Sequence, residues 1–170
     1  MAGHSEMPRA DLHEQLKSVR AKFLLVAGLG FSALVAISDL LIRILYDHRY
    51  HDAGWMLSVM LIGRWVSLLC YVNEAALLGF SRPLYSTYSN GLKFSLLLIG
   101  LPLVFIKYGI VGAIFFVVVS EIFRYLPLII GTTRERFSFV VQDLAMTLLM
   151  FGLVGLWEWL RLALGLGTFL

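Results

Sequence analysis

The chain alternates between long apolar runs and short polar segments. The apolar runs cover about residues 23–46, 54–80, 84–107, 110–131 and 140–162. Because a helix that crosses about 30 Å of hydrocarbon needs about 20 mainly apolar residues, each run is long enough for one crossing. The pattern predicts an all-α integral membrane protein, in which a bundle of about five transmembrane helices occupies residues 23–170.

The borders between runs carry recognisable helix breakers. Ser81 to Pro83 separate the second and third runs, since proline cannot continue the helix that precedes it. Lys107 to Gly109 separate the third and fourth runs. We expect Pro102 to kink the third helix, and Pro127 lies near the end of the fourth.

Residues 1–22 form a polar lead-in with a helical period in its second part. Leu12, Leu16 and Val19 are spaced i, i+4 and i+7, and charged residues occupy other positions. This spacing is typical of an amphipathic helix at a membrane surface, and we expect that helix to run directly into the first span. The first apolar run is longer than the roughly 7 to 15 residues of a cleaved signal, so we expect it to be retained.

Composition supports a membrane location. Apolar residues make up 59% of the 170 residues and charged residues 15%, against roughly half and a quarter in soluble domains. The net charge of +3 arises from basic residues near the ends of the apolar runs, which suits anionic lipid headgroups better than nucleic acid. We therefore expect membrane lipids as partners, and no nucleic acid.

Lysine and arginine in the short loops predict the orientation. Three segments would lie on one side of the membrane, and they contain Arg9, Lys17, Arg20, Lys22, Arg82, Arg134 and Arg136. The other side would receive Arg43, Arg49, Lys107 and Arg161, with acidic residues among them. This bias favours a cytoplasmic N-terminus.

Charged residues also lie inside the spans, where each costs roughly 2.5 to 3.5 kcal/mol and normally faces protein or water. On a helical projection the polar residues of each span share one face. The charged members are Asp39, Arg43, Arg64, Glu74, Lys93, Glu121, Arg124, Asp143, Glu158 and Arg161. Five spans turned toward a common interior would enclose a polar cavity with charges of both signs.

These charges have two interpretations. The first is a substrate or ion path, which we assign to Arg64, Glu74, Lys93, Glu121 and Arg124. The second is helix pairing near the span ends, with Asp39 beside Arg43 and Glu158 beside Arg161 within single helices. Glu121 and Arg124 also fit this second interpretation because they are three residues apart.

The sequence contains no pattern typical of an enzyme. It has no nucleophile elbow, phosphate loop, HExxH or CxxC motif. The segment from Asp47 to Asp52 holds two histidines and two carboxylates, but their spacing matches no defined metal site. We expect no catalytic residues, no metal and no cofactor.

Four stretches resemble the second half of polysaccharide flippases, the O-antigen and exopolysaccharide exporters of the multidrug/oligosaccharidyl-lipid/polysaccharide superfamily. They are LLIRILYD at 40–47, RYHDAGWML at 49–57, ALLGFSRP at 76–83 and SEIFRYL at 120–126. The resemblance implies a lobe of a bacterial inner-membrane transporter with about 12 to 14 spans in two pseudo-symmetric lobes. Such transporters move undecaprenyl-pyrophosphate-linked oligosaccharide by alternating access, and some are coupled to an ion gradient.

The chain departs from that plan because it holds about one lobe without the first two helices of that lobe. A lone lobe has no partner to rock against, so the resemblance implies a homo- or hetero-oligomer with another membrane subunit. A fragment, a split half and an inactive remnant all fit this length. The alternative function is a non-transporting membrane assembly or scaffold subunit, whose polar stripes bind helices of a partner.

Overall fold

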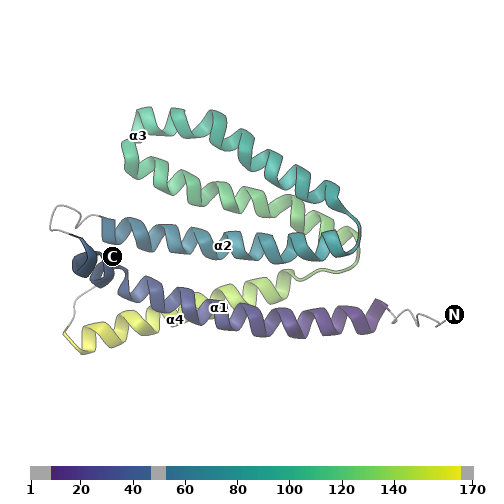
Figure 1. Cartoon of the computed structure of the whole chain (residues 1–170), viewed down its shortest axis with the longest axis horizontal. Coiled ribbons are helices and arrows are strands. Elements are labelled where there is room, and N and C mark those ends of the chain that lie inside the picture. Colours follow the sequence, from purple (N-terminus) through teal and green to yellow (C-terminus); the bar gives the residue numbers. More distant parts are fainter. Residues whose placement is uncertain (1–8, 47–52, 166–170) are drawn as a thin grey trace.

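A computed structural model describes residues 9–46 and 53–165, with side chains from Glu14 onward. Within these ranges the chain forms four helices and no strand: α1 (Arg9–Leu45), α2 (Ala53–Gly79), α3 (Pro83–Arg134) and α4 (Val140–Ala163) (Figure 1). All four are long and apolar enough to cross a membrane. The prediction of an all-α, multi-pass membrane bundle is confirmed.

Helix α3 contains two of the five predicted spans. Its 52 residues reverse direction at Gly109, whose φ of 65° and ψ of −156° are outside the helical region (Figure 1). Only glycine adopts this conformation at little cost, because it has no Cβ atom. The reversal divides α3 into a first leg (83–108) and a second leg (110–134), close to the predicted third and fourth spans.

Both prolines inside α3 lie within helical legs. The residue with non-helical φ and ψ is Gly109, and not Pro102 or Pro127. We expected a kink at Pro102, but the backbone keeps helical φ and ψ angles there. Proline is tolerated inside membrane helices because neighbouring groups can satisfy the backbone carbonyls that it frees.

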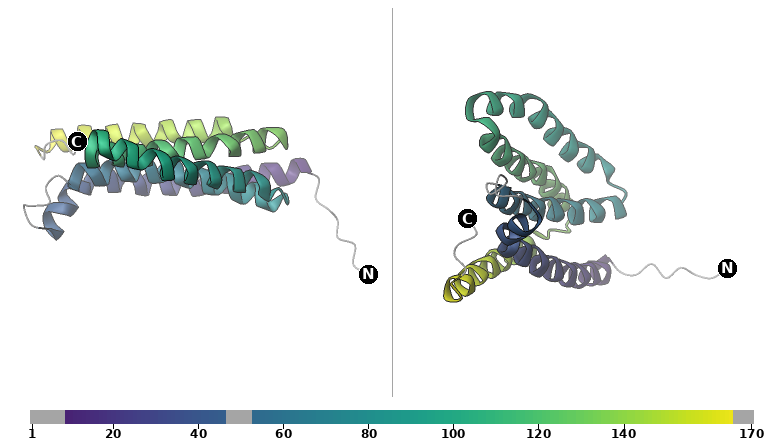
Figure 2. Two further views of the ribbon diagram at one scale, coloured as in Figure 1. Left: turned by 90° about the horizontal axis from the view of Figure 1, so that it is seen from above. Right: turned by 60° about the vertical axis from the view of Figure 1, so that its left-hand side comes forward.

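Helix α2 lies at the centre of the bundle. It packs against α1 on one side and α3 on the other, and α4 packs on α1 (Figures 1 and 2). Trp65 of α2, Leu24 of α1 and Met150 of α4 meet in one buried apolar cluster. A second cluster joins Leu77 of α2 to Leu128 in the second leg of α3.

The outer surface is unusually apolar for a protein of this size. Ile106, Val141 and Ile44 are each more than 80% exposed, and they belong to three different helices. Soluble monomers rarely expose large contiguous apolar patches. This surface is suited to lipid chains.

The predicted lead-in has no structural border at residue 22. Helix α1 is continuous from Arg9 to Leu45, so the expectation that the lead-in runs into the first span is confirmed. Arg20, however, is only 5% exposed and packs inside the bundle instead of facing the membrane surface. The last turns of α1 bend away from the direction of its earlier part (Figure 2).

Candidate functional site

Four of the five predicted path residues meet between α2 and the two legs of α3. Arg124 donates a hydrogen bond from Nη2 to Glu74 Oε2 at 2.9 Å, and its Nη1 lies 3.6 Å from Glu121 Oε2. Lys93 from the first leg forms an ion pair with the other oxygen of Glu121. Cations and carboxylates therefore alternate along one buried row, which we call the α2–α3 cluster.

Hairpin geometry explains why these residues meet. Lys93 precedes Gly109 by 16 residues and Glu121 follows it by 12, so both lie at similar distances from the reversal. At 1.5 Å per residue the difference is about 6 Å, which a lysine side chain can span. Glu121 and Arg124 are three residues apart on one helix and therefore face the same way.

Uncharged polar groups complete the α2–α3 cluster. Asn90 Nδ2 donates to Glu74 Oε1 at 3.0 Å, and the Ser86 hydroxyl donates to the same oxygen. The ring of Tyr71 lies 4.5 Å from the guanidinium carbon of Arg124. Buried charges are tolerated when such hydrogen bonds satisfy them.

Arg64 is the exception among the five path residues. It is the twelfth of the 27 residues of α2, about 17 Å from the start of that helix at 1.5 Å per residue. Its side chain is exposed and makes no ion pair or hydrogen bond with the described residues. It lines a cavity of about 90 Å³ together with Ser67, Lys93 and Glu121.

The charges around this cavity do not cancel. Arg64, Lys93 and Arg124 contribute three positive charges, whereas Glu74 and Glu121 contribute two negative ones. Within the described chain, Arg124 Nε and Glu121 Oε2 are also buried without a hydrogen-bond partner. The site thus has one surplus positive charge and one unused donor at Arg124, which suit an anionic group, whereas the unused oxygen of Glu121 does not.

A second polar cluster joins all four helices, and most of it could not be predicted from the sequence. Arg20 and Asn73 hydrogen bond at 3.2 Å, and Asn73 Nδ2 donates to Asp143 Oδ2 at 2.9 Å. Arg20 also forms an ion pair with Asp143, and the hydroxyl of Tyr125 donates to Asp143. Asp143 was visible as a charge in the last span, but Asn73 and Tyr125 are uncharged residues within apolar runs.

The third polar contact differs from the predicted pairing within single helices. Arg161 binds Asp39 through two hydrogen bonds, Nη1 to Oδ1 at 2.6 Å and Nη2 to Oδ2 at 2.8 Å. This pair joins α4 to α1, and Arg161 also donates to the carbonyl of Ala36. Asp39 therefore pairs across helices with Arg161, and Arg43, one turn further along α1, is exposed. Glu158 Oε2 is buried and accepts no hydrogen bond from the described residues.

The expected single polar interior is thus divided into three parts. The charges of α4 pair with α1, through Asp143 with Arg20 and through Arg161 with Asp39, and not with those of α3. No group of histidine, cysteine or carboxylate side chains suited to a metal occurs among the described residues. The segment 47–52, which holds the histidine pair considered above, lies outside the described residues.

The fold and its polar interior define a class: a multi-pass helical membrane protein with charged clusters between its helices. Comparison of the chain with protein-family models, curated proteins and solved structures found no match. The resemblance to polysaccharide flippases therefore stays a prediction from the sequence.

Proposed function

We propose that this chain is one lobe of an exporter of lipid-linked polysaccharide, acting in the bacterial inner membrane with a second membrane subunit. The observation that carries the proposal is the surplus positive charge at Arg64 beside the cavity of the α2–α3 cluster. A pyrophosphate-linked oligosaccharide has its negative charge where the lipid joins the sugar. A path for such a molecule needs a cation that is not already neutralised.

Energetics support a ligand-facing role for Arg64. An arginine at mid-bilayer costs roughly 2.5 to 3.5 kcal/mol even after local adjustment. Lys93 and Arg124 are compensated by carboxylates, but Arg64 is not compensated by a described residue. Water or an anionic substrate in the path would supply that compensation.

The ion pairs of the cluster also suggest how a substrate would change the conformation. An anionic group at Arg64 would compete with Glu121 for Lys93, which is 24% exposed and so accessible from the cavity. Glu121, released from Lys93, would be held by Arg124, whose Nη1 is already 3.6 Å from it. Exchange of partners weakens the contact between the two legs of α3, and no bond in the substrate is made or broken.

Alternating access requires a second lobe, because motion of one lobe against another opens the path to each side in turn. The first leg of α3 exposes Phe94, Leu98 and Ile106 by 63% or more, which leaves a broad apolar face for such a partner. A second copy of this chain or a different membrane subunit would serve. In this arrangement the N-terminus is cytoplasmic, because the ends of α1, α2 and α3 that carry the most lysine and arginine lie together (Figure 1).

A specific observation favours the alternative, a non-transporting assembly or scaffold subunit. Asp39, Glu74, Glu121 and Asp143 each form an ion pair within the chain, and all four pairs join different helices or α3 legs without involving Arg64. Such pairing is also what purely structural links between helices require. In that function Arg64 would contact an acidic residue of a partner helix.

Replacement of Arg64 by leucine in the source cell separates the two functions. Loss of a mid-span charge eases insertion, so a transporter should keep its protein level. Surface polysaccharide should fall about tenfold or more, because a charge-assisted contact contributes roughly 1.5 to 3 kcal/mol. Arg64→Lys keeps the charge and should retain part of the export.

Two outcomes contradict the transport proposal. Normal surface polysaccharide with Arg64→Leu removes Arg64 from the path. Disappearance of the Arg64→Leu protein together with a membrane partner, with Arg64→Lys restoring both, supports the assembly function instead.

A further inference from the structure

We propose that a groove between α1 and α2 binds an acyl chain of an anionic phospholipid. The groove has a volume of about 420 Å³, within the range of about 300 to 1,000 Å³ that is usual for small-molecule sites. It is lined by Leu16, Val19, Arg20, Phe23, Val72, Ala75, Ala76, Gly79, Phe80 and Phe139. The site is separate from the α2–α3 cluster and does not depend on the transport function proposed above.

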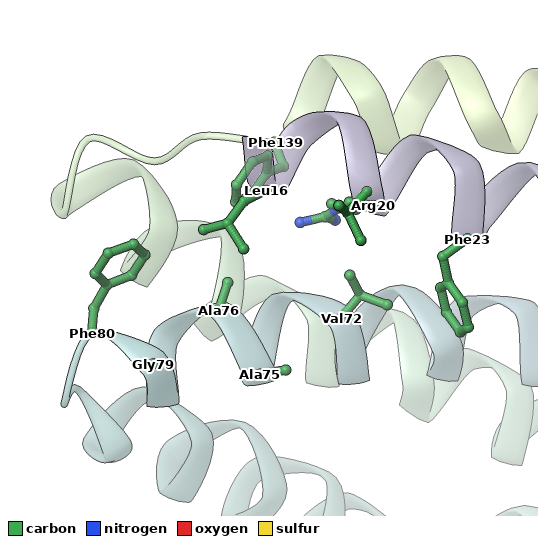
Figure 3. A pocket seen from close by; sticks show the side chains of 10 residues that line it. Leu16, Arg20, Phe23, Val72, Ala75, Ala76, Gly79, Phe80 and Phe139 are labelled. Atoms are coloured by element: carbon green, nitrogen blue, oxygen red, sulfur yellow. The ribbon is translucent and has the colours of Figure 1, made fainter. Parts of the chain in front are cut away.

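Small residues on α2 create the depth of the groove. Ala75, Ala76 and Gly79 occupy adjacent positions on the α2 face that meets α1 (Figure 3). A Cβ atom built on Gly79 would have no atom within 4 Å, so the open space reaches the backbone. Val19 and Phe23 of α1 form the opposite wall and are 68% and 52% exposed. Apolar side chains this exposed are available for contact with an acyl chain.

The one charged residue among those that line the groove, Arg20, is neutralised by Asp143, and its Nε atom is buried without a hydrogen-bond partner among the described residues. Arg20 already contacts Asn73 and Asp143, and its guanidinium carbon lies 4.3 Å from the ring centre of Phe139 (Figure 3). The loop end of the groove is the end beside the loops that follow α2 and precede α4. There, Phe80 stacks on Phe137 with ring centres 3.9 Å apart. The groove therefore offers aliphatic and aromatic walls to a ligand, which suits a hydrocarbon chain.

The charges near the loop end of the groove indicate the headgroup. Among the described residues there, Glu14 and Glu135 are the carboxylates outside the buried Arg20–Asp143 pair, and Glu135 is paired with Arg82 at 3.0 Å. Cations outnumber them, and those with exposed side chains are Lys17, Arg82, Arg134 and Arg136. A surplus of lysine and arginine at the membrane surface attracts anionic headgroups. An anionic phospholipid can satisfy both this surface and the apolar groove.

The length of the groove argues against a partner helix as its occupant. Along α2 it extends from Val72 to Gly79, which is about 10 Å at 1.5 Å per residue. A spanning helix would need a contact surface along most of the roughly 30 Å hydrocarbon thickness. A flexible acyl chain needs only the shorter groove.

The test is native mass spectrometry of the full chain, purified in mild detergent and incubated with dioleoylphosphatidylglycerol or dioleoylphosphatidylcholine. We expect one phosphatidylglycerol to be retained in preference to phosphatidylcholine. Gly79→Leu should fill the groove and weaken retention about tenfold or more, because each methylene kept out of an apolar site lowers affinity roughly fourfold. Gly152→Leu in α4 is the matched control, since a Cβ there also meets nothing within 4 Å, and it should retain the lipid.

Three results would overturn the proposal. Equal phosphatidylglycerol retention by Gly79→Leu and the wild type would show that the groove is not the lipid site. Equal retention of phosphatidylcholine would remove the role of the surface cations. A shift from oligomer to monomer in Gly79→Leu, with lipid retention unchanged, would identify the groove as a protein contact. Circular dichroism of both variants checks that a loss of lipid is not a loss of fold.

Discussion

Removal of the Asp143 carboxylate should destabilise the bundle more than any surface charge replacement. The side chains of Asp143 and Arg20 are each 4% exposed, so Asp143→Ala leaves the guanidinium of Arg20 buried without a carboxylate, in contact with the Asn73 amide and the Phe139 ring. Breaking a buried ion pair by removing one partner costs about 3 to 5 kcal/mol. Loss of the acceptor for the Tyr125 hydroxyl adds to that cost. We expect a decrease of about 3 kcal/mol or more in the free energy of unfolding.

The assay is reversible unfolding of the purified protein in mixed micelles, followed by circular dichroism. Arg20→Met with Asp143→Leu should recover most of the loss, because apolar side chains can replace a buried ion pair at little net cost. The coupling energy between Arg20 and Asp143 should be about 2 kcal/mol, within the range for residues in one network. Glu135→Ala is the control, since its partner Arg82 is 58% exposed, and exposed pairs contribute about 0 to 1 kcal/mol.

A small, additive effect would refute this reasoning. If Asp143→Ala costs less than about 1 kcal/mol and the double variant equals the sum of the single variants, the pair does not hold the four helices together. The lead-in part of α1 would then be free to leave the bundle. That result would favour the predicted position of the lead-in helix at the membrane surface over a position packed inside the bundle through Arg20.

Two glycines allow further tests. Gly109→Ala should destabilise the α3 reversal by about 1 to 3 kcal/mol in the same unfolding assay, because φ is 65° at that position. Gly91→Ala is the control and should be neutral or stabilising, because Gly91 is helical and a Cβ there meets no atom within 4 Å. Gly63→Ala should loosen the contact between α2 and the second leg of α3, because its Cβ would lie 2.8 Å from Val118. The control is Gly30→Ala, because a Cβ there meets no atom within 4 Å. Gly63→Ala should have a lower melting temperature than Gly30→Ala, and equal melting temperatures would contradict the predicted clash with Val118.

The helical content and the positions of the long apolar helices could be predicted from the sequence because each depends on one segment at a time. The third and fourth apolar runs were separated correctly at Lys107 to Gly109, although the structure joins them as α3. The break after α2 falls at Phe80 to Arg82, as Pro83 indicated. Apolar length and helix-breaking residues are local properties, and they were sufficient for these features.

Partners between helices could not be predicted in the same way. Asp39 and Arg161 are 122 residues apart, and their contact depends on α4 packing against α1. The helical projection placed each charge on a face but gave no order of helices around the bundle. Asp39 was therefore expected to pair with Arg43, its nearest cation along the helix, although Arg161 offers the better geometry, with two hydrogen bonds.

The division of the interior into separate polar clusters limits how such a lobe could move. Arg20 with Asp143 and Arg161 with Asp39 link α4 to α1 at two levels, and the first of these pairs is also bonded to Asn73 of α2 and Tyr125 of α3. The second leg of α3 is held to α2 by Arg124 with Glu74. It is joined to the first leg by Lys93 with Glu121 and by a hydrogen bond from the Ser89 hydroxyl to the carbonyl of Arg124. Lys93 is the most exposed of the cations in these four pairs, so its pair is the one that a ligand can reach most easily. A conformational change driven by an anion should therefore begin at the first leg of α3, which reverses into the second leg at Gly109 and forms one ion pair with the rest of the described bundle.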